Sequence, residues 1–440
     1  MKSLVNNKVI KFGIGGFFIL VLIFGRSFMG IYIFGMRIGE LSMGLSLLIL
    51  IFSLLFYKKI EVFDKILDKR TINIFSLLVL SFVFIAIYSN SSFINPYTYR
   101  ASSYIWTLGF LFLGIVYFEN NKLNKLYVYS FLPILLYIYF FSIYGLPQGA
   151  INFILSISDK FEPHKGSDLL LMYLCIFLIF NRYEINKRIA LEVFVLFSSL
   201  YFPLMLFKSR ASFIGFILFL IFEIYYLRGH FRGNLKRNIL LFLLAVFILF
   251  QSVFLVAGSG FLKISKTEEE VKYIATYRAD PDEEIFRLFY IAEDELGTKT
   301  TRIFSTDNNL NWRLQIWQDV AYDIHHKNLY FTGYGFSNKI PAMELETRQG
   351  LDKLNENVHN YIVTIFARGG LVTLFLVALM YINLVKRNIL FSEVSYIYVF
   401  LLPLLFNSLF DVAMENAHFP LLFYFIFGML FHKKKIFPNY

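Results

Sequence analysis

The sequence predicts an all-α integral membrane protein with about twelve transmembrane helices. Of its 440 residues, 57% are apolar, 20% are aromatic and only 17% are charged, and the mean hydropathy is +0.59. A soluble domain carries about a quarter of charged residues, so this composition excludes the soluble and the disordered classes. The apolar runs, roughly 15 to 25 residues long, suit helices that cross about 30 Å of hydrocarbon and are too continuous for barrel strands.

Apolar runs bounded by charged residues define the expected spans. The first run is kept as a span because no small-x-small cleavage site of a signal peptide follows it. The single cysteine, Cys175, lies within a span, so a buried thiol is expected and no disulfide framework is possible. The twelve predicted spans are residues 9–25, 39–57, 72–88, 102–118, 126–145, 168–181, 189–207, 211–227, 239–257, 369–385, 390–409 and 418–432.

Lys and Arg give the orientation, because short cytoplasmic loops hold the excess of positive charge. With both termini cytoplasmic, the cytoplasmic segments hold 22 Lys and Arg and the short outward segments hold 8. One long outward loop, residues 258–358, holds the other 12 with 17 Asp and Glu, a net charge of −5. The rest of the chain therefore carries a net charge of +16, which together with the −5 of the loop gives the total of +11. This positive charge anchors the chain to the membrane and predicts no nucleic-acid partner. These boundaries predict a membrane bundle over 1–257, a cap over 258–358 and a further part of the bundle over 359–440.

The long outward loop is predicted to be a helical cap. Thr267 with Glu270 forms a capping box, and Pro281 with Glu283 opens another helix. Helical apolar spacing follows at Ile285, Leu288, Phe289 and Ala292.

A later helix of the loop carries a charged residue on its apolar stripe. Arg313 leads this stripe, so it is either an internal ion-pair partner or a ligand contact. The glycines that follow, Gly333 and Gly335, permit a tight turn and close backbone approach, with no Rossmann context around them. The stripe consists of Arg313, Trp317, Val320, Ala321 and Ile324.

Arginine is unusually frequent among the outward cations. Five of the eight cations in the short outward segments are Arg, against seven of twenty-two on the cytoplasmic side. A guanidinium suits bidentate contact with phosphate or carboxylate. Each Arg could simply snorkel to the interface, but together they predict an anion site, most sharply at Arg210, which lies in a tight turn between two spans. The five are Arg26, Arg37, Arg100, Arg210 and Arg368.

His359 is the histidine best placed to act on a substrate. It lies where the outward loop enters the tenth span, with Asn360 adjacent, and it could accept a proton near neutral pH or serve as a structural residue at a helix start. Glu415 with His418, and His325 with its neighbours, form incomplete metal motifs. No metal or other cofactor is therefore expected.

Three motifs, in this order, resemble the family of bacterial O-antigen polymerases and O-antigen ligases. The resemblance covers about residues 205 to 385. The chain departs from the family pattern at Asn328 to Phe331, where a Pro often precedes the glycine pair, and at Arg368, where an acidic or small residue is expected. The motifs are SRxxxxG at Ser209, Arg210 and Gly215, R-x3-W with G-x-G at Arg313, Trp317, Gly333 and Gly335, and HN with glycine at His359, Asn360 and Gly369 or Gly370.

The resemblance implies a GT-C-like bundle in the bacterial inner membrane, with both termini cytoplasmic and a periplasmic active face. It implies a metal-independent glycosyltransferase whose donor is an undecaprenyl-diphosphate-linked oligosaccharide. His359 and Arg210 would be catalytic. The expected ligands of pyrophosphate and glycan are Arg313, Arg368, Arg100, Arg26, Arg37 and Asn360.

Polymerisation of lipid-linked repeat units is the favoured reaction, because the chain is rich in residues with AT-rich codons, a bias that polysaccharide-cluster genes often show. The alternatives are a ligase that transfers glycan to lipid A-core, and a twelve-helix flippase or transporter of lipid-linked oligosaccharide. The expected partners are the lipid-linked donor and acceptor, membrane lipids and a polysaccharide chain-length regulator.

Overall fold

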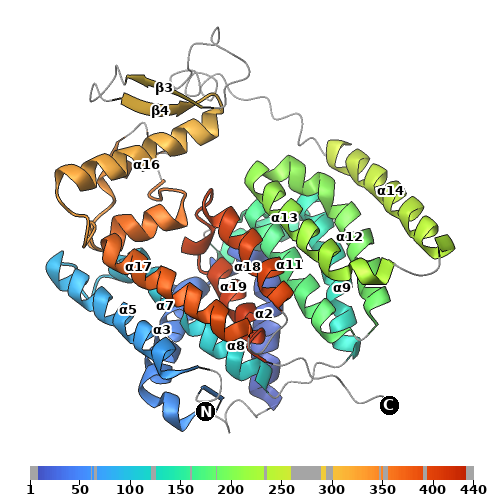
Figure 1. Cartoon of the computed structure of the whole chain (residues 1–440), viewed down its shortest axis with the longest axis horizontal. Coiled ribbons are helices and arrows are strands. Elements are labelled where there is room, and N and C mark those ends of the chain that lie inside the picture. Colours follow the sequence, from blue (N-terminus) through green and yellow to red (C-terminus); the bar gives the residue numbers. More distant parts are fainter. Residues whose placement is uncertain are drawn as a thin grey trace. The chain divides into compact units, whose positions relative to one another are not determined.

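The computed structural model describes most of the chain, and Figure 1 shows that the described part is almost entirely helical. The predicted all-α class is thereby confirmed. The chain divides into two compact units. Unit 1 comprises residues 1–76, 103–262 and 379–440, and unit 2 comprises residues 77–102 and 263–378. The described residues are 8–60, 62–63, 67–119, 125–158, 161–184, 186–231, 235–258, 289–293, 301–345, 348–349, 355–389 and 394–432.

Nine helices of the described part are long and apolar enough to cross a membrane, which makes this a multi-pass membrane protein. Each coincides with one of the predicted spans. They are α2 (Lys8–Met29), α3 (Ile38–Phe56), α5 (Lys69–Tyr88), α9 (Lys125–Tyr144), α11 (Gly166–Tyr183), α12 (Lys187–Lys208), α13 (Arg210–Leu227), α14 (Leu235–Gly258) and α17 (Tyr361–Ile389).

The other three predicted spans coincide with shorter helices. These are α7 (Ser103–Trp106) with α8 (Gly109–Glu119), α18 (Val394–Ser408) and α19 (His418–Met429). At 1.5 Å per residue, α8 and α19 are about 17 to 18 Å long, so neither crosses 30 Å of hydrocarbon alone. Both are buried, and they cross where Gly114 meets the backbone of Phe425 and Gly428 meets that of Ile115.

α11 forms the centre of unit 1. It is buried along nearly its whole length, including Cys175, as predicted. The Tyr173 hydroxyl pairs with that of Ser198 on α12 at 2.9 Å, so the helix contacts its neighbours through polar as well as apolar groups.

Unit 2 contains one of the two β-hairpins that the structure describes. β3 (Phe289–Glu293) pairs antiparallel with β4 (Thr301–Ser305), and the pair lies along α16 (Asn308–His326) in Figure 1. The predicted helix through Phe289 and Ala292 is therefore wrong at these residues. Aromatic and β-branched residues in both strands favour pairing, and this outweighs a helical spacing of apolar residues. The other residues of that prediction, Thr267, Glu270, Pro281, Glu283, Ile285 and Leu288, lie outside the described part.

Two of the membrane helices are broken by glycine. α2 has a kink at Gly25 (φ 51°, ψ −123°), and α17 has one at Gly370 (φ 64°, ψ −170°). A break frees the backbone N–H and C=O groups around it, which need other partners where water is excluded. The partners differ in the two units and shape both candidate regions.

Candidate functional site

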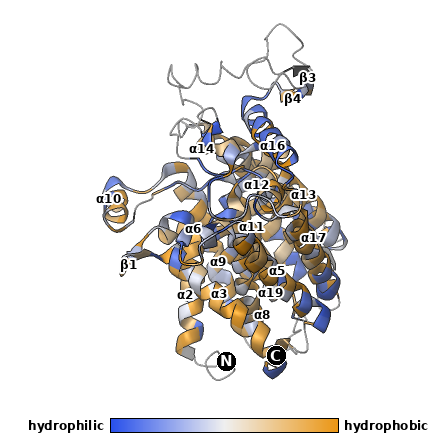
Figure 2. Cartoon of the chain, turned by 90° about the vertical axis from the view of Figure 1, so that its left-hand side faces the viewer, coloured by the Kyte–Doolittle hydropathy of each residue, from blue (hydrophilic) through white to orange (hydrophobic). Residues whose placement is uncertain are grey.

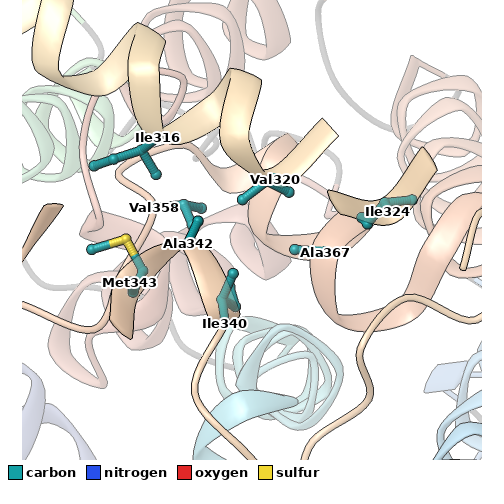
Figure 3. Close-up of a cluster of buried hydrophobic side chains, with 8 residues drawn as sticks. All are labelled: Ile316, Val320, Ile324, Ile340, Ala342, Met343, Val358 and Ala367. Carbon is teal, nitrogen blue, oxygen red and sulfur yellow. The ribbon is translucent and has the colours of Figure 1, made fainter. Parts of the chain in front are cut away.

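In unit 2, α16 is held against the segment that carries His359. Its buried positions Ile316, Val320 and Ile324 recur every four residues and face the residues shown in Figure 3. The predicted stripe is thus correct at Val320 and Ile324 but wrong at Ala321, which is exposed. The facing residues are Ile340, Ala342, Met343, Val358 and Ala367.

His359 has a left-handed backbone, with φ 55°. Such a backbone is uncommon outside glycine and often marks a functional position. The Trp317 indole N–H donates to the carbonyl of Val358 at 2.7 Å, which fixes the residue before His359 on α16. His359 itself is half-buried, and its Nδ1 is a buried atom.

The imidazole of His359 lies between an amide and an indole. Its Nε2 is 3.2 Å from Oδ1 of Asn355, and its ring is 5.0 Å from that of Trp312 in an edge-to-face arrangement. An N–H on Nε2 that donates to Asn355 makes Nδ1 the basic nitrogen. The buried indole N–H of Trp312 has no hydrogen-bond partner among the described residues, and an unsatisfied buried donor is a sign of a ligand or water.

Arg313 is next to Trp312 at the start of α16. It is half-buried and shares the helix face of Trp317, as the i, i+4 spacing predicts. The structure therefore brings Arg313, Trp312 and His359 to the same end of α16.

The glycine motif of unit 2 supplies hydrogen-bond partners to the backbone groups that the break in α17 frees. The N–H groups of Tyr334 and Gly335 donate to the carbonyls of Ala367 and Arg368 at 2.7 and 3.1 Å, and the N–H of Leu371 donates to the carbonyl of Tyr330 at 2.7 Å. The three carbonyl and N–H groups of α17 that the kink at Gly370 frees are thus satisfied by the turn. The predicted close backbone approach is present, and it serves the fold of the site.

Arg368 is buried and holds this turn from the other side. Its guanidinium donates to the carbonyls of Gly335, at 3.3 Å, and Asn338 and to the Tyr97 hydroxyl, at 2.9 Å, and it lies over the Tyr97 ring. These contacts hold the guanidinium against the turn and against Tyr97.

Asn360 and Arg100 also have protein partners in unit 2. Asn360 caps α17, because its Oδ1 accepts the N–H of Val363 at 3.0 Å. Arg100, in α6 (Pro96–Ala101), is mostly exposed and lies 3.6 Å from Glu356, which also pairs with Lys339 at 3.0 Å. Glu356 is three residues before His359, so Arg100 lies near the site at an exposed position.

In unit 1, Arg210 is the first residue of α13. Ser209 is the single residue between α12 and α13, and its hydroxyl caps α13 at the N–H of Ser212. This is the tight turn that the sequence predicts, and it leaves the Arg210 side chain exposed. A cation at the first turn of a helix opposes the helix dipole, so its placement there is not explained by helix stability.

The beginning of α11 fixes the Arg210 turn. A Cβ on Gly166 would lie 2.6 Å from that of Ser209, so the two backbones are in close approach. Ser212 donates to Asn407 of α18 at 2.8 Å, and Asp168 pairs with buried His418 of α19 at 2.7 Å. His418, considered in the sequence only as half of a metal motif, instead ties α19 to α11.

Arg26 and Arg37 have carboxylate partners in unit 1. Arg26 follows the break in α2 and lies 2.7 Å from Glu162, and Arg37 lies 3.9 Å from Glu40, with its Nε 3.3 Å from the Tyr32 hydroxyl. No group of three or more His, Cys, Asp and Glu in the described residues is arranged to hold a metal ion.

Several residues of the two regions escaped sequence analysis. Trp312 and Asn355 contact His359, and Asp168 supports the Arg210 turn. The pairing of Trp312 with His359 spans a long stretch of chain, so no local pattern shows it. The sequence feature that could have indicated Trp312 is that two of the three Trp of the chain lie within one polar helix.

The helices and these sites define a polytopic membrane protein with a histidine and arginines at the ends of its helices. Residues 193–378 match the family described as O-antigen ligase. The match contains Arg210, Arg313, His359 and Arg368, and it confirms the resemblance to the O-antigen polymerase and ligase family. It gives no support to the flippase alternative. No curated protein sequence matches the chain.

Proposed function

We propose that the protein is an O-antigen polymerase. It joins undecaprenyl-diphosphate-linked oligosaccharide repeat units at the periplasmic face of the bacterial inner membrane and releases undecaprenyl diphosphate. The observation that carries the proposal is the family match over residues 193–378, because it contains all three motif residues Arg210, Arg313 and His359. Both termini would lie in the cytoplasm.

The reaction would be a displacement at the reducing-end anomeric carbon of the lipid-linked chain. A hydroxyl oxygen of the incoming unit forms the new bond, and the bond to the diphosphate oxygen breaks with its electron pair leaving on undecaprenyl diphosphate. The hydroxyl proton passes to Nδ1 of His359, which the contact of Nε2 with Asn355 favours as the basic nitrogen. The unsatisfied indole N–H of Trp312 suits a sugar oxygen beside it.

The arginines would stabilise the departing diphosphate. Arg210 is exposed at the end of two spans, where a diphosphate on a membrane lipid would lie, and its guanidinium would neutralise charge that develops on the leaving group. Arg313 would bind the glycan or diphosphate beside His359. For Arg368 and Asn360, which the sequence predicts as ligands, the contacts with the turn and the cap of α17 support positioning roles. Arg26 and Arg37 in unit 1 and Arg100 in unit 2 would be outer contacts of the glycan or the diphosphate.

The test is chain growth by purified protein supplied with lipid-linked repeat units alone. Arg210→Ala and His359→Ala should each abolish laddering while the protein remains expressed and folded. Arg237→Ala and His326→Ala, both at exposed positions outside the two regions, are the matched controls. Normal ladders from Arg210→Ala and His359→Ala would refute the site. Transfer only after addition of lipid A-core would identify a ligase.

A further inference from the structure

We propose that two short elements of unit 1 form a surface that inserts into the lipid interface at the end of the bundle that carries Arg210. One is the β-hairpin of β1 (Tyr32–Ile33) and β2 (Met36–Arg37), between α2 and α3. The other is α10 (Gln148–Ile157), between α9 and α11. We call the exposed apolar side chains of the two elements the interface patch: Ile33, Phe34, Met36, Phe153, Leu155 and Ile157.

The two elements are joined to each other. Ile31, just before the hairpin, forms an antiparallel β-bridge with Ser158, just after α10. Figure 2 shows α10 and β1 standing out from the same side of the bundle. The patch is therefore one surface, built from two parts of the chain.

The tip of the hairpin has a backbone that a phenylalanine rarely adopts. Phe34 and Gly35 both have positive φ, at 52° and 79°, as in a type I′ turn. Asn, Asp or Gly normally occupies such a turn, and a bulky residue there costs on the order of 1 kcal/mol or more. Phe34 is nevertheless 96% exposed, so nothing in the described part of the chain repays this cost. A partner outside the described part of the chain would repay it.

α10 has an apolar and a polar face. At 100° per residue, Gln148, Asn152 and Ser156 fall on one narrow arc and the apolar residues fill the rest. None of its ten residues is fully buried, and none is charged. A helix with one apolar and one polar face suits an interface between apolar and aqueous phases.

The short connections to the spans identify the partner as the lipid bilayer. Three residues separate the end of α9 at Tyr144 from α10, so its start lies within about 14 Å of that span. The hairpin leads directly into α3 at Ile38. The interfacial layer adds roughly 5 to 8 Å on each side of the hydrocarbon, so elements joined this closely to the ends of spans are within reach of its level. Arg37 at the base of the hairpin stacks on Tyr32, which suits the belt of headgroups.

The patch lies at the end of the bundle that holds the Arg210 turn, because Gly166 at the start of α11 contacts Ser209. Under the proposed function this is the outer leaflet, where the lipid-linked donor arrives, and the assignment of the leaflet alone rests on that function. The patch would hold the bundle at a fixed depth, so that Arg210 meets the donor diphosphate at the headgroup level.

The depth of the patch can be measured because the chain has a single, fully buried cysteine. In a Cys175→Ala background, Phe34→Cys and Phe153→Cys would carry an NBD label, with Asn152→Cys on the polar arc as the matched control. The full protein is placed in vesicles of phosphatidylethanolamine and phosphatidylglycerol. Lipids spin-labelled at a shallow acyl position should quench positions 34 and 153 at least threefold more than position 152, and aqueous iodide should do the reverse.

Three results would overturn the proposal. Equal iodide quenching at all three positions would show that the patch is in water. Equal quenching at all three by a deep acyl label would show that α10 lies in the hydrocarbon. Energy transfer between labelled copies that rises with the protein-to-lipid ratio would show that a second copy covers the patch.

The role of the interface patch in the reaction is tested by the double variant Phe34→Asp/Phe153→Asp in the chain-growth assay. The KM for the lipid-linked donor should rise at least fivefold with kcat nearly unchanged, and an unchanged KM would contradict a role in presenting the donor. The quenching experiment needs no turnover. A failure of the proposed function, seen as active Arg210→Ala protein, is therefore distinct from a failure of the interface patch.

Discussion

The two glycine breaks differ in what seals them. At Gly370 of α17, backbone groups of residues 330, 334 and 335 replace the lost helical hydrogen bonds. At Gly25 of α2, side chains take part: His164 donates from Nε2 to the carbonyl of Ile23 at 2.9 Å, and Glu162 pairs with Arg26. We call these two sets of hydrogen-bond partners the backbone seal and the side-chain seal. The backbone seal leaves no room for a Cβ and does not depend on pH. The side chains of the other seal can be substituted, and they can titrate.

The largest expected effect is that of Gly370→Ala. Its φ and ψ of 64° and −170° are accessible essentially to glycine alone, and the new Cβ would lie 2.3 Å from the carbonyl carbon of Phe331. We expect a destabilisation of about 4 kcal/mol and loss of chain growth. Thermal unfolding in detergent measures it. Gly44→Ala in α3, where a Cβ meets nothing within 4 Å, is the control. A wild-type melting temperature for Gly370→Ala would contradict the backbone seal.

The next effect is expected at the Arg210 turn. An alanine at Gly166 would bring its Cβ to 2.6 Å from that of Ser209 and would displace the turn. Misplacing a catalytic group by about 1 Å costs on the order of 100-fold in rate, so kcat should fall by that amount while the protein stays folded.

The fall in kcat that Gly166→Ala causes should depend on the presence of Arg210. In an Arg210→Ala background, binding of undecaprenyl diphosphate should be the same with Gly or Ala at position 166. A further loss of binding in that background would show that Gly166 acts elsewhere. Gly149→Ala, with open space around it, is the matched control.

The side-chain seal of α2 predicts a pH dependence that the break in α17 lacks. Burial lowers the pKa of His164 from 6.5 to about 4, against the opposing charge of Asp168. A lowered histidine pKa gives stability that is complete above pH 6.5 and is lost as the pH falls towards 4, by about 2 kcal/mol at pH 5. The melting temperature should therefore fall between pH 6.5 and 5. His164→Gln keeps an N–H donor without titrating, and an unchanged pH slope in this variant would reject the assignment.

The difference between the two breaks also explains what the sequence could reveal. Gly333 and Gly335 indicate a tight turn in the sequence because glycine permits close backbone approach, and Gly370 is named there only as the alternative to Gly369 in a family motif. The spans and the Arg210 turn follow from apolar runs and the charges that bound them. His164, Asp168 and Trp312 did not stand out, because their partners, Ile23, His418 and His359, are distant in sequence and any of several residue types could make the contact. The prediction of a helix at β3 was wrong because Phe289 and Ala292 also satisfy a helical spacing.

The smallest effect is expected for Arg368→Lys, which removes the side-chain reinforcement of the backbone seal. Lysine can replace only part of the contacts with Gly335, Asn338 and Tyr97. If the backbone hydrogen bonds carry the seal, the loss should be about 1.5 kcal/mol, with KM for the lipid-linked donor nearly unchanged. Arg100→Lys, at an exposed ion pair, should change stability by less than about 0.5 kcal/mol. A tenfold rise in KM for Arg368→Lys at wild-type stability would instead make Arg368 a direct ligand of the diphosphate, because a planar guanidinium would then be needed at the substrate rather than in the turn.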